Sequence, residues 1–303
     1  MKRSEQVTDF RLPAISAIVE LMKPITWFPP MWAFGCGVVS AGIGFEGRWP
    51  FVVVGALLTG PLVCATSQIV NDWYDRDVDA INEPNRPIPS GRVPGEWGFI
   101  LALCWTAVSL VVAASLGLAV FGAAIIGLAL AWAYSAPPPR LKKNGWWGNS
   151  AVALCYEGLP WITGATVMAG MLPGWKALLI PLLYSFGAHG IMTLNDFKSI
   201  EGDKRLGIAS LPVQLGADRA ALVACAMMAA PQVVVAGLLV EWGSPIHAAA
   251  IAVSLIIQLY LMTRLVKKPR ELAPWYNATG VSLYVSGMLI AAFALRHLYG
   301  GSG

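Results

Sequence analysis

Two short acidic runs carry the clearest chemical signal in this sequence. The first begins at Asn71 and holds four aspartates within eight residues, at the end of an apolar stretch. If a helix continues through it, Asp72, Asp75 and Asp79 share one face with Asn71 beside them, and Asp77 points elsewhere. Clustered carboxylates repel one another, so such a face normally persists because a divalent cation neutralises it. Ligands that are all oxygen favour Mg²⁺.

The second run begins at Asn195 and repeats the Asn-Asp-aromatic order of the first. It sets Asp203 seven residues after Asp196, the same separation as in the first run, but Ser199 stands where the first run has Asp75. Arginines and lysines border both acidic runs. A single such run could consist of ordinary charged residues in a solvent-exposed loop. Two related copies, each at the end of an apolar stretch, instead predict a site for a metal ion and a diphosphate.

The composition places the chain among membrane proteins. Hydrophobic residues make up 56%, charged residues 13%, and the mean hydropathy is +0.62, which excludes an ordinary soluble domain. The charge is too small and too scattered for a nucleic-acid-binding protein, so we expect no nucleic-acid partner. The bilayer is the expected surroundings, with membrane lipids as neighbours.

We predict an all-α integral membrane protein with nine transmembrane helices, because about 20 apolar residues cross a bilayer as one helix. Four helices separate the two acidic runs, which predicts two four-helix units plus a ninth helix around a central cavity. The domains are then a cytoplasmic amino-terminal segment (1–24), the membrane domain (25–299) and a short Gly-Gly-Ser-Gly tail (300–303) that could be a remnant of cloning. The expected spans are 25–44, 51–71, 98–116, 119–136, 147–170, 177–196, 220–240, 246–265 and 276–297.

The distribution of basic residues predicts the orientation. With the amino terminus inside, only Arg48, Lys176 and Arg296 of the 21 lysines and arginines lie outside, and the other 18 are cytoplasmic. Both acidic runs then face the cytoplasm. Three prolines in residues 83–92 predict a stiff loop beside the first run, which is either a lid or a plain connector.

Two ionisable residues lie deeper in the predicted spans. Glu157 falls within the fifth span, and an acid inside the membrane is a functional candidate by default. His189 lies seven residues before Asp196 on nearly the same helical face, and a helix-packing role is its alternative.

The order N-D-x-x-D-x-x-x-D from Asn71, together with the second run, resembles the UbiA-type intramembrane prenyltransferase superfamily. The longer string at 71–92, supported by residues 23–37, 133–149 and 195–216, resembles the chlorophyll and bacteriochlorophyll synthases within it. Many superfamily members carry an aspartate where this chain has Ser199, but those synthases share the serine.

The resemblance implies transfer of a C20 prenyl group, geranylgeranyl or phytyl, from its diphosphate to the 17-propionate carboxylate of a chlorophyllide or bacteriochlorophyllide. It implies Mg²⁺, with Mn²⁺ as a substitute, bound by the catalytic carboxylates and one amide: Asn71, Asp72, Asp75, Asp79, Asp196 and Asp203. Basic residues would bind the diphosphate: Arg76, Arg86, Lys142, Lys198 and Lys204. Candidates for the substrate pocket are Tyr74, Tyr134, Tyr156, Glu157, Trp161 and His189.

Other functions share some of these features. A quinone precursor or haem could replace the chlorophyllide as prenyl acceptor, and a pigment-binding protein without catalysis would leave the acidic runs unexplained. A cation-coupled transporter would also keep carboxylates in a membrane domain. Transporters, however, hold their ligands near the bilayer midplane, whereas these aspartates are predicted at helix ends.

Overall fold

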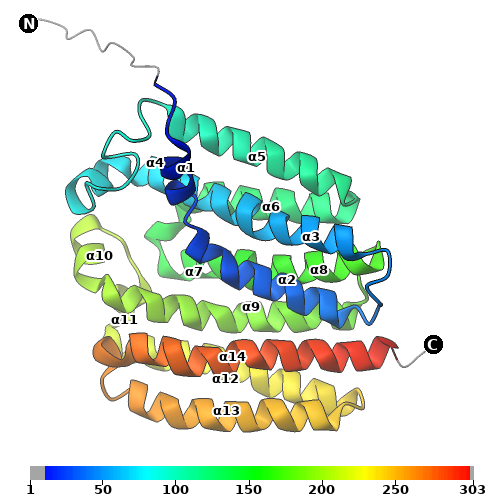
Figure 1. Cartoon of the computed structure of the whole chain (residues 1–303). Coiled ribbons are helices and arrows are strands. Elements are labelled where there is room, and N and C mark those ends of the chain that lie inside the picture. Colours follow the sequence, from blue (N-terminus) through cyan, green and yellow to red (C-terminus); the bar gives the residue numbers. More distant parts are fainter. Residues whose placement is uncertain (1–10, 301–303) are drawn as a thin grey trace, which may run out of the picture.

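The computed structural model describes residues 11–300, and in that range helices form the whole architecture apart from one isolated bridge between Asn144 and Ala209 (Figure 1). In chain order the elements are α1 (Ile15–Leu21), η1 (Pro24–Trp27), α2 (Phe28–Ser40), α3 (Trp49–Leu57), η2 (Leu58–Cys64), α4 (Ala65–Asn82), α5 (Trp97–Ser115), α6 (Leu118–Ser135), η3 (Leu141–Lys143), α7 (Gly145–Ala153), η4 (Leu154–Gly158), α8 (Leu159–Ala169), α9 (Trp175–Asn195), η5 (Asp196–Lys198), α10 (Ile200–Leu206), α11 (Leu211–Leu215), α12 (Ala217–Glu241), α13 (Pro245–Leu265) and α14 (Pro269–Gly300).

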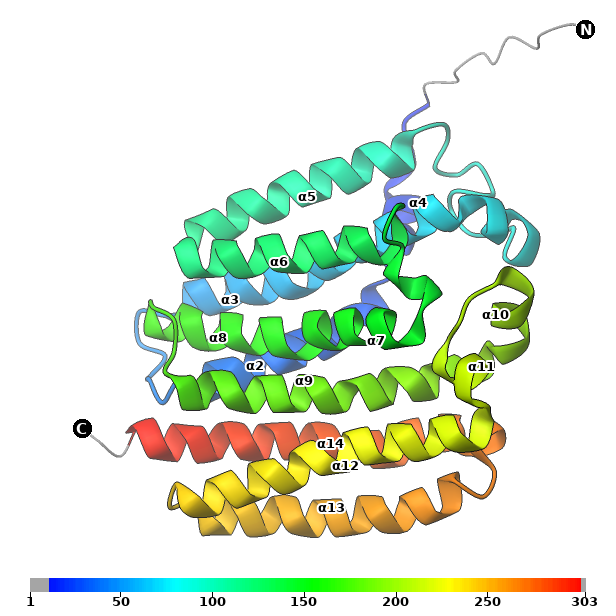
Figure 2. The same ribbon diagram turned by 180° about the vertical axis from the view of Figure 1, so that it is seen from behind.

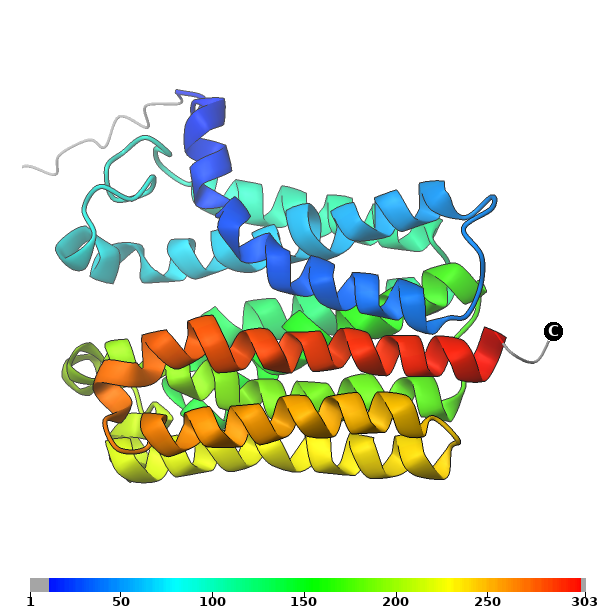
Figure 3. The ribbon, with the colours of Figure 1, turned by 60° about the horizontal axis from the view of Figure 1, so that its bottom comes forward.

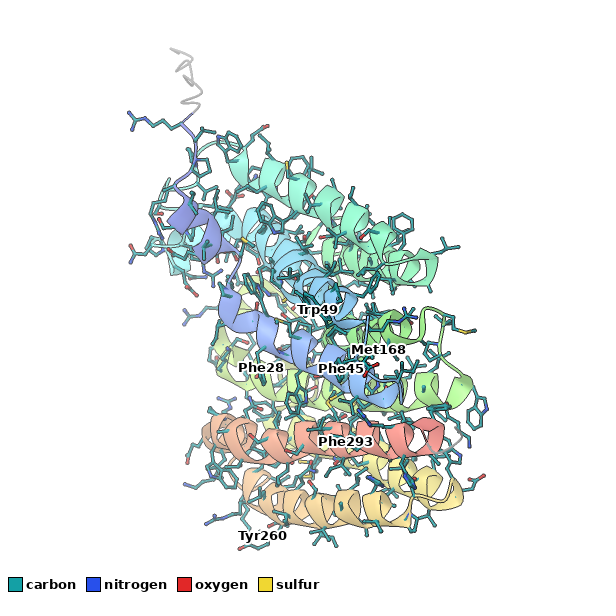
Figure 4. All side chains as sticks on the ribbon, turned by 45° about the vertical axis from the view of Figure 1, so that its right-hand side comes forward. Phe28, Phe45, Trp49, Met168, Tyr260 and Phe293 are labelled. Carbon is teal, nitrogen blue, oxygen red and sulfur yellow. The ribbon has the colours of Figure 1, made fainter. Side chains whose placement is uncertain are left out.

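Seven helices within the described residues are long and apolar enough to cross a membrane. Their outer surfaces carry large apolar side chains, among them Trp49, Tyr260 and Phe293 (Figure 4), as expected of helices that face lipid. The expectation of an all-α, multi-pass integral membrane protein is confirmed. The seven are Trp49–Asn82, Trp97–Ser115, Leu118–Ser135, Trp175–Lys198, Ala217–Glu241, Pro245–Leu265 and Pro269–Gly300.

The other two expected spans are helical but differ from a plain membrane helix. The span 25–44 is shorter than predicted, because η1 and α2 together end at Ser40. The span 147–170 is divided into α7, a π-helical turn η4 and α8. The predicted break between the third and fourth spans is confirmed at Gly117, whose φ of 112° suits a residue without a side chain.

The helices lie roughly parallel in layers. In Figures 1 and 2, α3 to α6 form one side of the molecule, α2, α7, α8 and α9 lie in the middle, and α12, α13 and α14 form the other side, which comes forward in Figure 3. The loop after α4 and the short helices α10 and α11 gather at one end, and the carboxyl terminus lies at the opposite end (Figure 1). The polar ends of α4 and α9 therefore meet at the same end of the bundle.

Glycines bring α2 and α8 into direct backbone contact. A Cβ atom on Gly37 would collide with the carbonyl oxygen of Trp161, and one on Gly164 would collide with that of Phe34. Close approach of this kind is how membrane helices gain packing energy where the hydrophobic effect is weak. Both α2 and α8 also contact η4, so their close packing fixes the position of η4.

Candidate active site

Helix α4 continues through the first acidic run and ends at Asn82, so the predicted common face exists. Asp72 and Asp79 are buried, with 1% and 7% of their surfaces exposed, and Asp75 is half-buried. Asp77 is exposed on another face of the helix. The spacing of the aspartates therefore predicted correctly which of the four point inward.

Two cations bind the buried aspartates. Lys23 Nζ lies 2.6 Å from Asp72 Oδ1. Arg86, from the proline-rich loop after α4, donates to Asp79 Oδ2 at 2.7 Å and lies 3.5 Å from Asp72 Oδ1. Burial lowers the pKa of Arg86, but the bonds to Glu83 and the charges of Asp72 and Asp79 outweigh it, so the pKa is raised overall.

Asp75 is held by two further cations from the segment after α6. Lys142 Nζ donates to its Oδ2 at 2.6 Å and Arg140 Nη2 to its Oδ1 at 3.2 Å. Burial lowers the pKa of Lys142, and the charge of Asp75 opposes that shift. Asn71 Nδ2 donates to Asp75 Oδ2 at 3.1 Å and to Ser135 Oγ at 3.2 Å, which orients both groups.

The second acidic run is positioned by neighbouring amide and hydroxyl groups. Asp196, where α9 ends, accepts a hydrogen bond from Asn149 Nδ2 at 3.1 Å, and Asn149 is itself buried on α7. Ser199 Oγ donates to Asp203 Oδ2 at 3.1 Å. The serine that replaces the middle carboxylate of the first run thus orients the last aspartate of the second.

Tyr134 lies near both runs, because the charges of Asp75, Asp196 and Asp203 all act on it. Behind Tyr134 and Asn71 a cavity of about 240 Å³ extends between η2, α4, α6 and η4. A smaller space of about 30 Å³ lies along α6 and α8 and shares Thr59, Val63 and Cys155 with the wall of this cavity. The larger cavity, called the channel below, starts beside Asn71, which donates a hydrogen bond to Asp75, so it lies next to the first acidic run.

A second cavity, of about 510 Å³, lies between α2, α9 and α14. Val152 and Tyr156 line both cavities, so the two are neighbours, and Glu157 lines only the second. Tyr156 and Glu157 belong to the π-helical turn η4, and Cys64, in the first cavity's wall, belongs to the π-helical η2. Such turns are rare and occur frequently at functional sites.

Three predicted basic residues do not contact the aspartates. Arg76 folds back on its own helix, with Nη1 2.7 Å from the carbonyl oxygen of Trp73 and its guanidinium 4.2 Å from that ring's centroid. Lys198 and Lys204 are exposed, and Lys204 Nζ lies 4.0 Å from Glu201. Of the predicted diphosphate-binding residues, the structure brings Arg86 and Lys142 to the first acidic run.

Tyr134, Tyr156 and Glu157 line the two cavities, but the other predicted pocket residues line neither. Tyr74 packs edge-on against Trp132, with ring centroids 6.4 Å apart. Trp161 is fully buried and donates to Ser40 Oγ at 3.1 Å. These contacts are those of core residues.

His189 also packs in the interior. Its Nε2 lies 3.3 Å from the carbonyl oxygen of Trp146, so Nε2 carries the proton, and its ring is 5.6 Å from the Trp146 ring. These contacts suit the helix-packing alternative, but the Nδ1 atom of His189 is buried without a hydrogen-bond partner.

Three positioning residues were missed from the sequence: Lys23, Arg140 and Asn149. Lys23 is 49 residues from Asp72, and its backbone is left-handed, with φ of 46°, at the junction of α1 and η1. No local pattern indicates that contact. Arg140 could have been found, because it stands in the same basic run as Lys142.

The donor set suits Mg²⁺ bound together with a phosphate. No three His, Cys, Asp or Glu side chains within residues 11–300 converge on a single point. Mg²⁺ does not need such a cage, since it usually takes one or two carboxylates and completes its shell with water and substrate phosphates. Asp72 Oδ2 is buried and has no hydrogen-bond partner, so the site holds an oxygen free to act as a ligand.

The fold is a helical membrane bundle, and its acidic site is bordered by four cations and lies beside the channel. This arrangement suits a membrane protein whose substrate has a charged head and an apolar tail. The chain belongs to the UbiA prenyltransferase family, whose sequence pattern matches residues 24–295.

Relatives support the assignment along nearly the whole chain. The chain is 56% identical to the bacteriochlorophyll synthase 33 kDa chain of Cereibacter sphaeroides, over 95% of both proteins. It is 37% identical to the chloroplastic chlorophyll synthase of Oryza sativa, over 92% of this chain and 76% of that protein. The fold is similar to that of a UbiA homologue from Archaeoglobus fulgidus solved with GPP and Mg²⁺, with a TM-score of 0.69 and 20% identity over 88% of this chain and 99% of that one.

Proposed function

We propose that this protein transfers a C20 prenyl group, geranylgeranyl or phytyl, from its diphosphate to the 17-propionate carboxylate of a bacteriochlorophyllide. The product is the ester that completes a bacteriochlorophyll. The similarity to the Cereibacter sphaeroides bacteriochlorophyll synthase chain carries the choice of acceptor. The site geometry independently supports a prenyl diphosphate as the donor.

The cations at the first acidic run would bind the diphosphate. Lys23, Arg86, Arg140 and Lys142 neutralise aspartates in the structure, and all four can exchange those partners for phosphate oxygens. The channel behind Asn71 would take the first part of the prenyl chain, and the rest of the chain would run toward the smaller space beside α6 and α8.

Asn71, Asp72, Asp75 and Asp79 would hold Mg²⁺ on one side of the diphosphate, and Asp196 and Asp203 on the other. When bound, Mg²⁺ would offset the negative charge that develops on the departing diphosphate. Mn²⁺ is a chemically similar substitute for such oxygen ligands. Asn149 and Ser199 keep the second pair of carboxylates oriented for this role.

In the transfer step, the bond between prenyl C1 and the diphosphate oxygen breaks, and its electron pair leaves with the diphosphate. A propionate oxygen gives an electron pair to C1 and forms the ester bond. The propionate is already ionised near neutral pH, so no side chain must remove a proton from it. The rings of Tyr134 and Tyr156 line the channel where positive charge develops on C1, and aromatic faces stabilise cations.

The same proposal includes the membrane topology. Nine spans, among them η1–α2 and α7–η4–α8, would form two four-helix units and a ninth helix. The acidic runs, α1 and the long loop after α4 gather at one end (Figure 1), and the excess of lysine and arginine in the loops at that end supports a cytoplasmic active site. The membrane would be the bacterial inner membrane or its photosynthetic invaginations.

The test uses the purified protein in detergent with bacteriochlorophyllide, Mg²⁺ and either geranylgeranyl or phytyl diphosphate. We expect the esterified pigment by chromatography and mass spectrometry, with one diphosphate released per ester. Parallel reactions with a quinone precursor and with haem should give no product. Prenylation of either of those acceptors in place of the bacteriochlorophyllide would refute the proposal.

A further inference from the structure

Glu157 is a buried acid, and the surrounding protein gives its Oε2 atom no hydrogen-bond partner. Only 5% of its surface is exposed, its Oε2 atom is buried without a hydrogen-bond partner, and it forms no ion pair within the described residues. Burying an unpaired carboxylate is strongly unfavourable, so the side chain is held in its neutral form. A neutral carboxyl group offers an O–H donor.

The donor lies on the wall of the cavity of about 510 Å³ between α2, α9 and α14. That wall is mostly apolar, with Phe28, Trp32, Ile191 and Met192 among its residues. Its other polar side chains already make at least one hydrogen bond each: Thr26, Tyr156, Asn195, Asn277 and Ser282. Two atoms on this wall are buried without a hydrogen-bond partner, Glu157 Oε2 and Asn277 Oδ1. The amide oxygen of Asn277 can only accept, so the neutral carboxyl group of Glu157 is the unpaired donor that a bound carbonyl can satisfy.

The cavity's position relates Glu157 to the transfer reaction. Tyr156, next to it in η4, lines the channel assigned above to the prenyl chain, and Val152 lines both spaces. A flat apolar ring held beside Glu157 would place a side arm across this shared wall, toward C1 of the prenyl group. This assignment of the cavity rests on the proposed function.

We propose that Glu157 donates a hydrogen bond to a carbonyl oxygen on the rim of the tetrapyrrole and so selects acceptors that carry that carbonyl. The ring lies against the apolar wall, and the hydrogen bond fixes its rotation within the cavity. An acceptor without the carbonyl leaves the buried donor unpaired and binds more weakly. Glu157 takes no part in breaking the bond to the diphosphate.

The test compares Glu157→Gln, which keeps a donor, with Glu157→Met, which keeps the volume and removes it. Binding of bacteriochlorophyllide and of its deoxo analogue, which lacks the ring carbonyl oxygen, is followed by pigment absorbance without prenyl diphosphate. We expect the wild type and Glu157→Gln to prefer the carbonyl-bearing acceptor by roughly five- to a hundredfold, and Glu157→Met to bind both equally. Met192→Leu, on the same wall, should keep the preference.

Steady-state kinetics separates this role from others. Glu157→Met should raise the KM for the acceptor while leaving the KM for the prenyl diphosphate within twofold. It should also unfold at or above the wild-type temperature, because it removes an unpaired buried polar group. The inference is overturned if Glu157→Met still discriminates between the two acceptors. It is also overturned if Glu157→Gln raises the KM for the acceptor as much as Glu157→Met does, which would indicate a charged role. If the wild type forms no pigment ester at all, the proposed function fails instead.

Discussion

Replacing Asp72 by Asn should remove most of the activity without disturbing the fold. Asp72 lies on the inward face of α4, next to Lys23 and Arg86. Asn has the same shape, and its amide oxygen can still accept the hydrogen bond from Lys23, so the local packing is preserved. What the change removes is the negative charge and the unpartnered oxygen that would act as a metal ligand.

The size of the effect follows from the role of that charge. Losing one well-placed electrostatic contact to the leaving group costs about 3 to 4 kcal/mol in the transition state, which lowers kcat by about 100- to 1000-fold. The effect falls on kcat more than on the KM for bacteriochlorophyllide, because Asp72 does not line the cavity proposed for the acceptor. Thermal unfolding in detergent should shift by only a few degrees.

Asp77→Asn provides the matched control. Asp77 lies on the same helix, five residues away, and its substitution changes the charge by the same amount, but its side chain is exposed on another face. Ester formation by Asp77→Asn should equal that of the wild type within about twofold, the usual scatter for an exposed site. If Asp72→Asn keeps more than a third of wild-type kcat, or if both variants are equally impaired, the assignment of α4's inward face to the diphosphate is refuted.

Three further outcomes are expected. Lys142→Met should raise the KM for the prenyl diphosphate by about ten- to a hundredfold, because the proposed charge-assisted bond between Lys142 and the diphosphate is lost. Lys143 is exposed, so Lys143→Met should leave this KM unchanged. Steady-state kinetics checks both variants. Gly37→Ala should lower the unfolding temperature, because its Cβ would collide with the Trp161 backbone. Gly35→Ala, with open space around its Cβ, should keep or raise the unfolding temperature. An unchanged unfolding temperature for Gly37→Ala would contradict the close packing of α2 on α8. A chelator should abolish ester formation, and added Mg²⁺ should restore it; turnover that persists without a divalent cation would exclude the proposed role of the aspartates.

Local patterns in the sequence determined much of the framework. Hydrophobic runs of membrane length identified the class of protein, because a buried backbone in lipid must form helices. The period of the helix determined which aspartates of the first run share a face, and Gly117 marked a break that a residue with a side chain would resist. The strings around the two acidic runs were long enough to indicate the family that the comparison confirmed.

The tertiary structure decided the rest, because the deciding contacts join residues far apart in the chain. Nothing near Lys23 in sequence predicts its bond to Asp72, and nothing near Asn149 predicts its bond to Asp196. Within a membrane helix, every aromatic or ionisable residue is flanked in the sequence by apolar residues, so the sequence does not show which of them faces a cavity. Only the packing of one helix on another placed Glu157 on a cavity wall and His189 against the backbone of Trp146.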